Sequence, residues 1–145
     1  MKILVPVDGS KYSMEAIKVA IDYAKTKGAN ICLINVVPFI EGIDLEISAS
    51  EMGKLNETFA KRADYILQQA CGVLTAEDVI STCRQVVASA SIPDAIVDFA
   101  EKEKVNLIII GSRGLGKSSR FKMGSVASKV VKHSPCSVYV VKMSE

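Results

Sequence analysis

Short apolar runs alternate with amphipathic segments along the whole chain, and this alternation constrains the fold more than any other feature. The runs are rich in Ile, Leu and Val, which is typical of strands buried on both faces of a sheet. The segments between them repeat apolar residues at helical spacing. We therefore expect an α/β fold in which helices cover both faces of an open, five-stranded parallel sheet through right-handed crossovers. The strands are expected near residues 3–7, 31–37, 78–88, 105–110 and 138–141.

Four helices are expected between these strands, and residues that favour helix ends mark their limits. Helix starts are indicated, in chain order, at Ser10 or Ser13, at Met52, at Ser91 and at Gly124; helix ends are indicated at Gly28, Gly72 and Ser134. Residues 38–50 show no clean period and predict a long loop, which could be a lid or a surface for a partner.

The length and composition fit one domain over residues 1–145, because 49% of the 145 residues are apolar and 23% are charged. No apolar run approaches the roughly 18 residues that span a bilayer. The apolar stretch before Asp8 is too short for a signal-peptide core. We therefore expect a cytoplasmic protein that does not bind a membrane.

The four cysteines lie far apart without a C-x-x-C pair, and the chain holds one histidine. Zinc spacing is therefore absent. Cys32 and Cys136 stand among apolar residues, where a free thiol packs as a small hydrophobe. We interpret the cysteines as structural thiols. The histidine, His133, ends the last expected helix, where a cation suits the helix dipole.

Positive charge is concentrated in the last quarter of the chain. The overall net charge is only +2, which excludes a dedicated nucleic-acid binder. Residues 1–110 hold 11 basic and 15 acidic residues, whereas residues 111–145 hold 7 basic residues and one acidic residue. This asymmetry indicates either a solvated basic surface or an anion site.

The segment from Gly111 to Gly124 combines glycines, basic residues and the start of a helix. In a parallel sheet, ligands lie beyond the carboxyl ends of the strands, where both this segment and Asp8-Gly9-Ser10 are expected. Glycines let several backbone N–H groups approach one anion, and a helix N-terminus adds its own N–H groups. The Ser125 hydroxyl can also donate to a phosphate oxygen. The basic residues here are Arg113, Lys117, Arg120 and Lys122. The pattern predicts a phosphate site; the alternative is a mobile basic loop.

The string from Gly111 to Ser118 matches the P-loop pattern G-x-x-x-x-G-K-S. A P-loop requires its helix to begin near the Lys-Ser, yet the apolar helical stripe begins only at Ser125. Only 27 residues follow Ser118, too few for the strands that usually come after a P-loop. A P-loop kinase or NTPase is therefore the less favoured interpretation.

A second pattern in the same segment, G-x-x-G, nine residues and then G-S, is formed by Gly111, Gly114, Gly124 and Ser125. With Lys2–Ser10, Leu107–Gly114 and Pro135–Val141, it resembles single-domain universal stress proteins of the ATP-binding type. The resemblance covers essentially the whole chain. It implies a Rossmann-like, adenine nucleotide alpha hydrolase-like fold with strand order 3-2-1-4-5.

The resemblance also implies where a nucleotide binds. Adenine would pack near Pro6, Val7 and Val36. Asp8 would contact the ribose and can help hold Mg²⁺ or Mn²⁺ near the phosphates; the alternative for Asp8 is a helix cap or turn former. The remaining implied contacts are Gly111, Ser112, Arg113 and Gly114 to ribose and phosphates, and Gly124, Ser125 and Val126 to phosphates.

The function that the resemblance implies is an ATP-binding module that acts as a stress-response or regulatory switch. We find no nucleophile–base pair in the sequence, so no catalytic residue is assigned and hydrolysis is expected to be slow at most. The resemblance also implies a homodimer through the last strand, around Val138 to Val140, and leaves room for a further protein partner. The alternative is a dimeric interaction protein of the same fold that binds no nucleotide.

Overall fold

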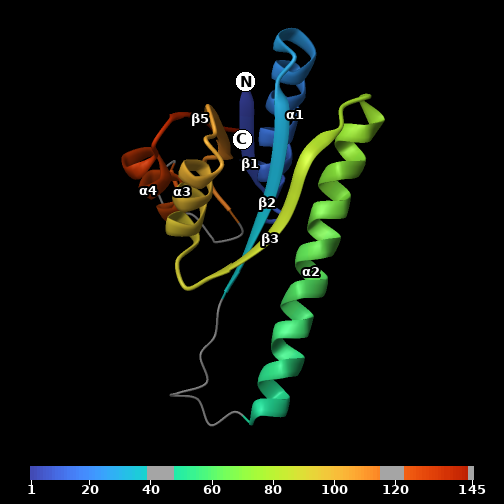
Figure 1. Ribbon diagram of the computed structural model, residues 1–145, viewed down its shortest axis with the longest axis vertical. Helices are drawn as coiled ribbons and strands as arrows, with labels where there is room; N and C mark the ends of the chain where they lie inside the picture. Colours follow the sequence, from blue (N-terminus) through green and yellow to red (C-terminus); the bar gives the residue numbers. More distant parts are fainter. Residues whose placement is uncertain (39–47, 115–122, 144–145) are drawn as a thin grey trace.

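The computed structural model describes residues 1–38, 48–114 and 123–143. Its centre is a five-stranded parallel sheet in the order β3-β2-β1-β4-β5 (Figure 1). The strands are β1 (Lys2–Pro6), β2 (Asn30–Pro38), β3 (Ser81–Ser89), β4 (Leu107–Gly111) and β5 (Ser137–Val141). The parallel sheet and the strand order 3-2-1-4-5 are confirmed.

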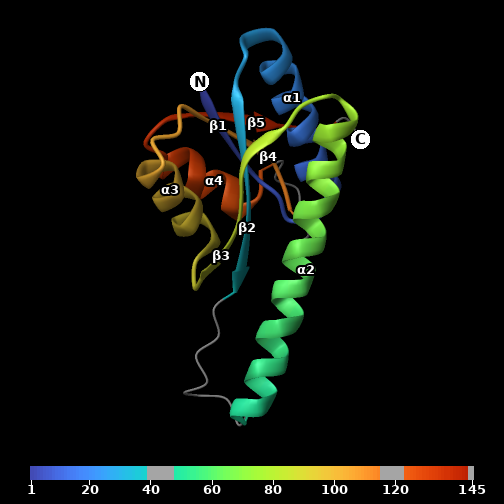
Figure 2. The same ribbon diagram turned by 45° about the vertical axis from the view of Figure 1, so that its right-hand side comes forward.

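Helices cover both faces of the sheet. Helices α1 (Lys11–Lys27) and α2 (Ala49–Ala76) pack on one face, and α3 (Ile92–Lys102) and α4 (Ser125–His133) pack on the other (Figures 1 and 2). Alternate residues of β1 divide between the two cores, with Ile3 and Val5 toward α1 and α2, and Leu4 toward α3 and α4; Val7, just after the strand, continues the first set. Because successive side chains of a strand point to opposite faces of the sheet, the position of a residue in β1 determines which of the two cores it enters.

Serine side chains cap α1 and α3 where the sequence indicates helix starts. Ser10, rather than Ser13, is the N-cap of α1, and its hydroxyl accepts a hydrogen bond from the Ser13 N–H. Ser91 caps α3 in the same way, with Pro93 in its first turn. Gly28 ends α1 in a left-handed conformation, with φ of 64°. These limits agree with the sequence because they depend on local backbone chemistry.

The limits of α2 differ from those that the sequence predicts. The helix begins at Ala49, after Ser48 as N-cap, and it runs through Gly72 to Ala76. Gly72 does not close it, because the following turn buries Leu74 completely in the core. Strand β3 starts at Ser81 rather than at residue 78, since the chain first turns through Asp78. Of the predicted loop over residues 38–50, positions 39–47 lie outside the described residues.

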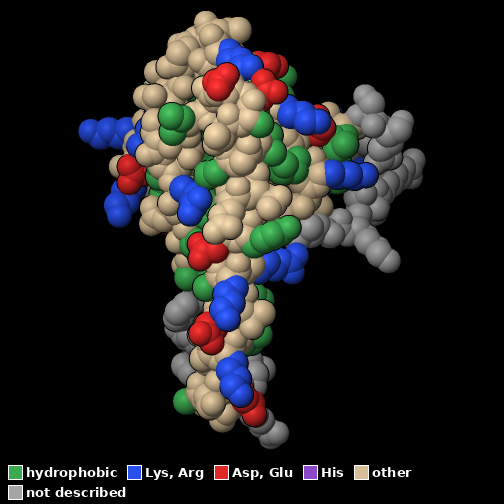
Figure 3. Space-filling view, turned by 90° about the vertical axis from the view of Figure 1, so that its right-hand side faces the viewer, with side chains coloured by type: hydrophobic (Ala, Val, Ile, Leu, Met, Phe, Trp, Pro, Cys, Tyr) green, Lys and Arg blue, Asp and Glu red, His purple; other side chains and the backbone are tan. Residues whose placement is uncertain are grey.

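Only the second half of α2 packs on the sheet. Its buried residues are Ala63, Leu67, Ala70 and Leu74. The first half stands beyond the body of the molecule as a narrow column on which basic and acidic side chains alternate (Figure 3). Although α2 has 28 residues, no helix in the described part of the chain is long and apolar enough to cross a membrane.

The prediction that Cys32 packs as a free thiol is wrong. Cys32 of β2 and Cys83 of β3 stand directly opposite each other and form a disulfide, with their Cα atoms 4.4 Å apart. The sequence gives no sign of this pairing, because the two residues are 51 positions apart and meet only through the register of two strands. Cys71 and Cys136 are free and partly buried.

Candidate functional site

The candidate site lies at the carboxyl edge of the sheet, where β1 and β4 are neighbours. The chain passes from β1 to β2 on one side of the sheet and returns to β4 on the other side of β1. A crevice for ligands forms where the strand order reverses in this way. Asp8 follows β1, and the glycine-containing segment from Gly111 follows β4.

Asp8 belongs to a tight turn between β1 and α1. Its Oδ1 accepts a hydrogen bond of 2.8 Å from the Ser10 N–H. Gly9, between them, has φ of 87°, a conformation that favours glycine. Asp8 therefore forms the turn but is not the helix cap, which is Ser10. One carboxylate oxygen is fixed by this turn, while Oδ2 faces the segment after β4.

Gly114 lies directly against Asp8. A Cβ atom on Gly114 would come within 2.6 Å of Asp8 Oδ2, closer than any side-chain carbon tolerates. The segment after β1 and the segment after β4 thus meet at Asp8 and Gly114, two residues that the sequence analysis predicts in the same site. Only a residue without a side chain leaves the carboxylate in its present position.

Backbone hydrogen bonds hold the start of α4 beside this contact. The Ser112 N–H donates to the Val141 carbonyl at 2.8 Å, and the Ser112 carbonyl accepts from the Gly124 N–H at 2.7 Å. Ser112 is only 2% exposed, and these two hydrogen bonds satisfy its buried backbone N–H and carbonyl groups. Arg113 is partly buried and lies close to Gly124, since a Cβ on Gly124 would stand 3.5 Å from its Cα.

The N-terminus of α4 differs from those of the other described helices. Serine side chains cap α1, α2 and α3, whereas no side-chain hydrogen bond from the described residues caps α4, whose N-cap is Gly124. The first N–H groups of a helix need partners and carry partial positive charge. Ser125, the first residue of α4, is exposed, and Val126 packs partly against the core below. This helix end is suited to an anion.

The residues implied for adenine lie at the same edge but do not share one face. Val7 is 3% exposed and belongs to the core under α1 and α2, so its side chain does not face a ligand at this edge. Val36 is partly buried toward α3 and α4. Pro6 points to that face too, by alternation from Leu4. The structure thus brings Pro6 and Val36 to one face.

Asn35 is a residue of this edge that sequence reasoning missed. It is 6% exposed, and its Nδ2 donates to the Val7 carbonyl at 2.7 Å. The Val7 N–H in turn donates to the Ile34 carbonyl. The amide side chain therefore ties together the ends of β1 and β2. An amide in the otherwise apolar run of residues 31–37 was the available signal, because a buried polar side chain requires a partner.

Gly111 has a packing role at the end of β4. A Cβ there would lie 2.8 Å from the backbone carbonyl carbon and from the Cβ of Tyr12, in the first turn of α1. The glycine allows the end of β4 to pass against α1. Because the Asp8 turn leads directly into α1, this contact also sets the distance between the segment after β1 and the segment after β4.

Asp8 is the carboxylate that the structure places beside Gly114 at this site. Within residues 1–38, 48–114 and 123–143, no group of three or more His, Cys, Asp or Glu could hold a metal ion. A cation beside Asp8 would therefore take its other ligands from phosphate oxygens and water. Lys117, Arg120 and Lys122 of the predicted phosphate site, and the Lys-Ser of the P-loop string, lie outside the described residues.

Comparison with known proteins agrees with this fold over its full length. The sequence model of the universal stress protein family matches residues 1–142. Universal stress protein MJ0531 of Methanocaldococcus jannaschii is 36% identical over 148 residues, which cover 97% of this chain and 81% of that protein. The solved structure of universal stress protein UspA from Lactobacillus plantarum superimposes with a TM-score of 0.82 at 25% identity, covering 98% and 97% of the two chains.

Some proteins of the same fold have been solved with adenine nucleotides. An Archaeoglobus fulgidus universal stress protein in complex with dAMP has a TM-score of 0.68 at 22% identity, covering 98% of each chain. A family protein from Arabidopsis thaliana with AMP bound has a TM-score of 0.71 at 18% identity, covering 99% of this chain and 92% of that one. At these identities the likeness establishes the fold.

Proposed function

Because this chain belongs to the universal stress protein family, we propose that it binds an adenine nucleotide at the carboxyl edge of β1 and β4 and acts as a nucleotide-dependent switch in a stress response. Proteins of the same fold have been solved in complex with cAMP, dAMP and AMP, and the proposal extends this binding of adenine nucleotides to the present chain. Binding then changes the conformation or the partners of the protein.

The observation that carries the proposal is the meeting of Asp8, Gly114 and the start of α4. A carboxylate that can accept from ribose hydroxyls stands against Gly114, whose lack of a side chain leaves that carboxylate in its present position. Next to it, the N–H groups of α4 have no side-chain cap among the described residues. Together these groups match the two chemistries of a nucleotide, its hydroxylated sugar and its anionic phosphates.

We propose ATP as the preferred ligand. Three basic residues, Lys117, Arg120 and Lys122, follow Gly114 in the sequence without an acidic residue among them, which favours a highly charged phosphate chain. A Mg²⁺ or Mn²⁺ ion would enter with the phosphates, with Asp8 as its protein ligand. When bound, such an ion neutralises phosphate charge.

We propose that binding, rather than turnover, is the activity. The sequence pairs no nucleophile with a base at this edge, so any ATP hydrolysis is slow. Phosphate release from ATP, measured beside a buffer control and a heat-denatured sample, tests this point. Multiple turnovers per minute would contradict it.

Backbone NMR with added nucleotide tests the site. Titration with ATP is expected to shift the amide resonances of Asp8, Gly114, Gly124 and Ser125. The Asp94 amide at the start of α3 is the internal control, because Ser91 already caps that helix. Parallel titrations with ADP, AMP and GTP show how the affinity depends on the number of phosphates and on the base. Unshifted resonances at millimolar ATP would contradict the proposal and favour an interaction protein that binds no nucleotide.

Two further measurements separate the remaining alternatives. Mass spectrometry of small molecules released by denaturing the purified protein is expected to identify a bound adenine nucleotide. Lys117→Ala is expected to weaken ATP binding only moderately, since its charge is one of several in the segment. Complete loss of binding in this variant would instead favour a P-loop site.

A further inference from the structure

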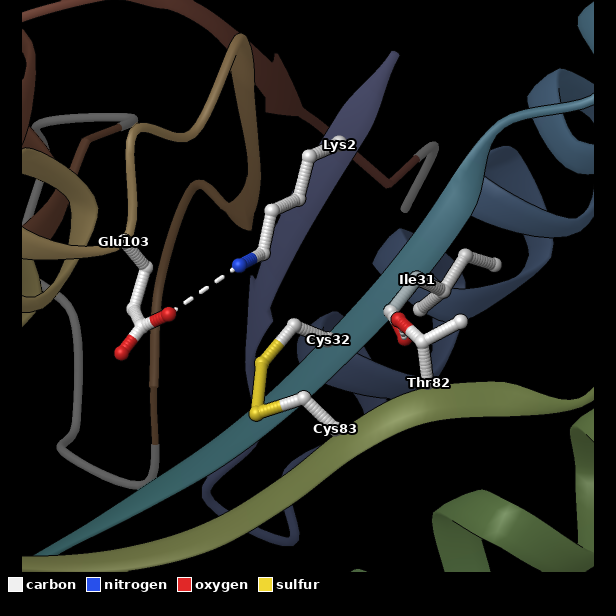
Figure 4. A network of polar contacts seen from close by, with 6 residues as sticks. All are labelled: Lys2, Ile31, Cys32, Thr82, Cys83 and Glu103. Atoms are coloured by element: carbon white, nitrogen blue, oxygen red, sulfur yellow. Dashed lines mark hydrogen bonds and ion pairs between the residues drawn. A yellow bond between two sulfur atoms is a disulfide. The ribbon is translucent and has the colours of Figure 1, made fainter.

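The disulfide of the structure joins the central part of the sheet to one of its edge strands. Cys32 lies in β2, and Cys83 lies in β3, the strand at the end of the sheet order. Figure 4 shows the two side chains pointing toward each other between these strands, where their sulfur atoms are bonded. Both residues belong to the face of the sheet that α3 and α4 cover.

A break in the strand register aligns the two cysteines. Ile31 pairs with Ser81, but the next residue, Cys32, pairs with Cys83, so Thr82 is an extra residue in β3. The Thr82 hydroxyl donates to the Ile31 carbonyl at 3.2 Å and holds this irregularity in place (Figure 4). Without the extra residue, Cys32 would face Thr82, and the two sulfur atoms would point to opposite faces of the sheet.

The two cysteines differ in their burial. Cys32 is completely buried, whereas Cys83 is partly exposed. Of the two residues, Cys83 is therefore the one that a small oxidant can reach from solvent. A partly exposed thiol with a second thiol within bonding reach is the arrangement of a redox-responsive pair.

We propose that Cys32 and Cys83 are a reversible redox site that reacts with a peroxide through Cys83. The Cys83 thiolate attacks one oxygen of hydrogen peroxide, the O–O bond breaks, and hydroxide leaves and becomes water. The Cys32 thiol then attacks the Cys83 sulfenic acid, the S–S bond forms, the S–O bond breaks, and a second water leaves. The two thiols supply the two electrons that reduce the peroxide, and a small-molecule thiol returns them by exchange.

Oxidation links the edge strand β3 covalently to its neighbour β2. Among the described strands β3 pairs only with β2, so its attachment depends on one ladder of hydrogen bonds. A covalent bond across that ladder keeps β3 in place when the ladder opens. Because the bond closes a loop of about 50 residues in the unfolded chain, we expect the oxidised protein to melt at least about 5 °C higher than the reduced protein.

Counting thiols tests the proposal. The reduced protein is exposed to hydrogen peroxide, quenched in acid, denatured, and labelled with N-ethylmaleimide before intact-mass measurement. The wild type is expected to take four labels before peroxide and two after it, and four again after treatment with dithiothreitol. Four labels after peroxide, or fewer than four after dithiothreitol, would overturn the proposal.

Single Cys→Ser variants give matched controls within the same chain. Cys71→Ser and Cys136→Ser are each expected to fall from three labels to one after peroxide, because they keep the pair. Cys83→Ser is expected to keep three labels and to lose the peroxide-dependent rise in melting temperature. Loss of two labels in Cys83→Ser, or of none in Cys71→Ser, would mean that the reacting pair is not Cys32 and Cys83 and would contradict the assignment.

Discussion

Gly114 and Asp8 make the closest approach between the two halves of the candidate site, and a single methyl group is enough to test it. In Gly114→Ala the new Cβ would lie 2.6 Å from Asp8 Oδ2, so the carboxylate or the backbone at Gly114 must shift from its present position. If that carboxylate holds the ribose, we expect ATP affinity, measured by calorimetry, to fall about tenfold, the equivalent of one hydrogen bond.

A double-mutant cycle separates this contact from a general disturbance. In an Asp8→Ala background, Gly114→Ala is expected to have little further effect on affinity, because the clash is gone. An equal loss in both backgrounds would contradict the role of the contact. Gly72→Ala is the control for added bulk at a glycine, since nothing surrounds its Cβ position; it should leave affinity unchanged and stabilise α2 by about 0.5–1 kcal/mol.

The exposed pair between Lys25 and Glu77 gives a prediction of pH dependence. Their hydrogen bond of 2.6 Å joins the ends of α1 and α2. It lowers the pKa of Glu77, chiefly through the Lys25 hydrogen bond, and raises the pKa of Lys25. A lowered carboxyl pKa stabilises the fold above the unfolded value, near 4.3, and this contribution is lost as the pH falls through the folded pKa. The raised Lys25 pKa contributes below the ordinary lysine value and is lost at high pH.

We therefore expect Lys25→Ala to return the pKa of Glu77 toward the ordinary glutamate value, as followed by carboxyl carbon NMR. The difference in unfolding free energy between the variant and the wild type should be small, because both side chains are exposed. It should also shrink as the pH falls below about 4. A Glu77 titration that does not respond to Lys25→Ala would contradict the assignment.

At the scale of elements, the sequence predicts what local chemistry determines. Ser10, Ser91 and Gly28 mark helix limits because each acts on backbone groups within a few residues of itself. The end of α2 was not predictable in this way, because Leu74 continues the helix past Gly72 by packing in a core built from distant strands. The Cys32–Cys83 pair depends on the extra residue Thr82, which no local pattern reveals.

The same distinction holds for the candidate site. Its position after β1 and β4 follows from the apolar strand pattern together with the two glycine-containing turns. That Gly114 meets Asp8 could be inferred only from the resemblance to a family, because the contact crosses more than 100 residues of sequence. Asn35 was missed since its partner, the Val7 carbonyl, lies on another strand.

Helix α2 contains two halves that differ in packing, and one substitution made in each half measures the difference. Leu67 is 1% exposed within the core, whereas Leu55 is partly exposed in the projecting half. We expect Leu67→Ala to lower the unfolding free energy by about 2–5 kcal/mol, because it leaves a cavity. Leu55→Ala should cost less than about 1 kcal/mol.

Urea unfolding followed by circular dichroism measures both free energies. Each variant is the control for the other, because both make the same Leu→Ala change with the same effect on helix propensity. Equal losses would mean that the first half of α2 contributes to the folded core as much as the second half does. The projecting half would then have a partner that supplies the missing contacts.

At the scale of the whole molecule, the sheet ends in two edge strands, and β5 is the one that we propose pairs with a second copy of the chain. The Ser112 N–H donates to the Val141 carbonyl, so the backbone groups of Val141, and by alternation those of Tyr139, face β4. The N–H and carbonyl groups of Val138 and Val140 therefore point away from the sheet. Tyr139 is 42% exposed beside them. An apolar edge of this kind favours pairing.

Val140→Pro removes an outward N–H without touching the ladder to β4, and proline is tolerated at such edge positions. We expect the wild type to be a dimer by light scattering at micromolar concentration and Val140→Pro to dissociate at least about tenfold more readily, since main-chain pairing is lost on both copies of a two-fold interface. Ile80→Ser, at an 82% exposed residue before β3, is the control and should stay dimeric. Should Val140→Pro fold poorly, Val138→Pro makes the same change one outward position away. A monomeric wild type would contradict the proposed dimer, and a dimer equally stable in both proline variants would place its interface on another surface.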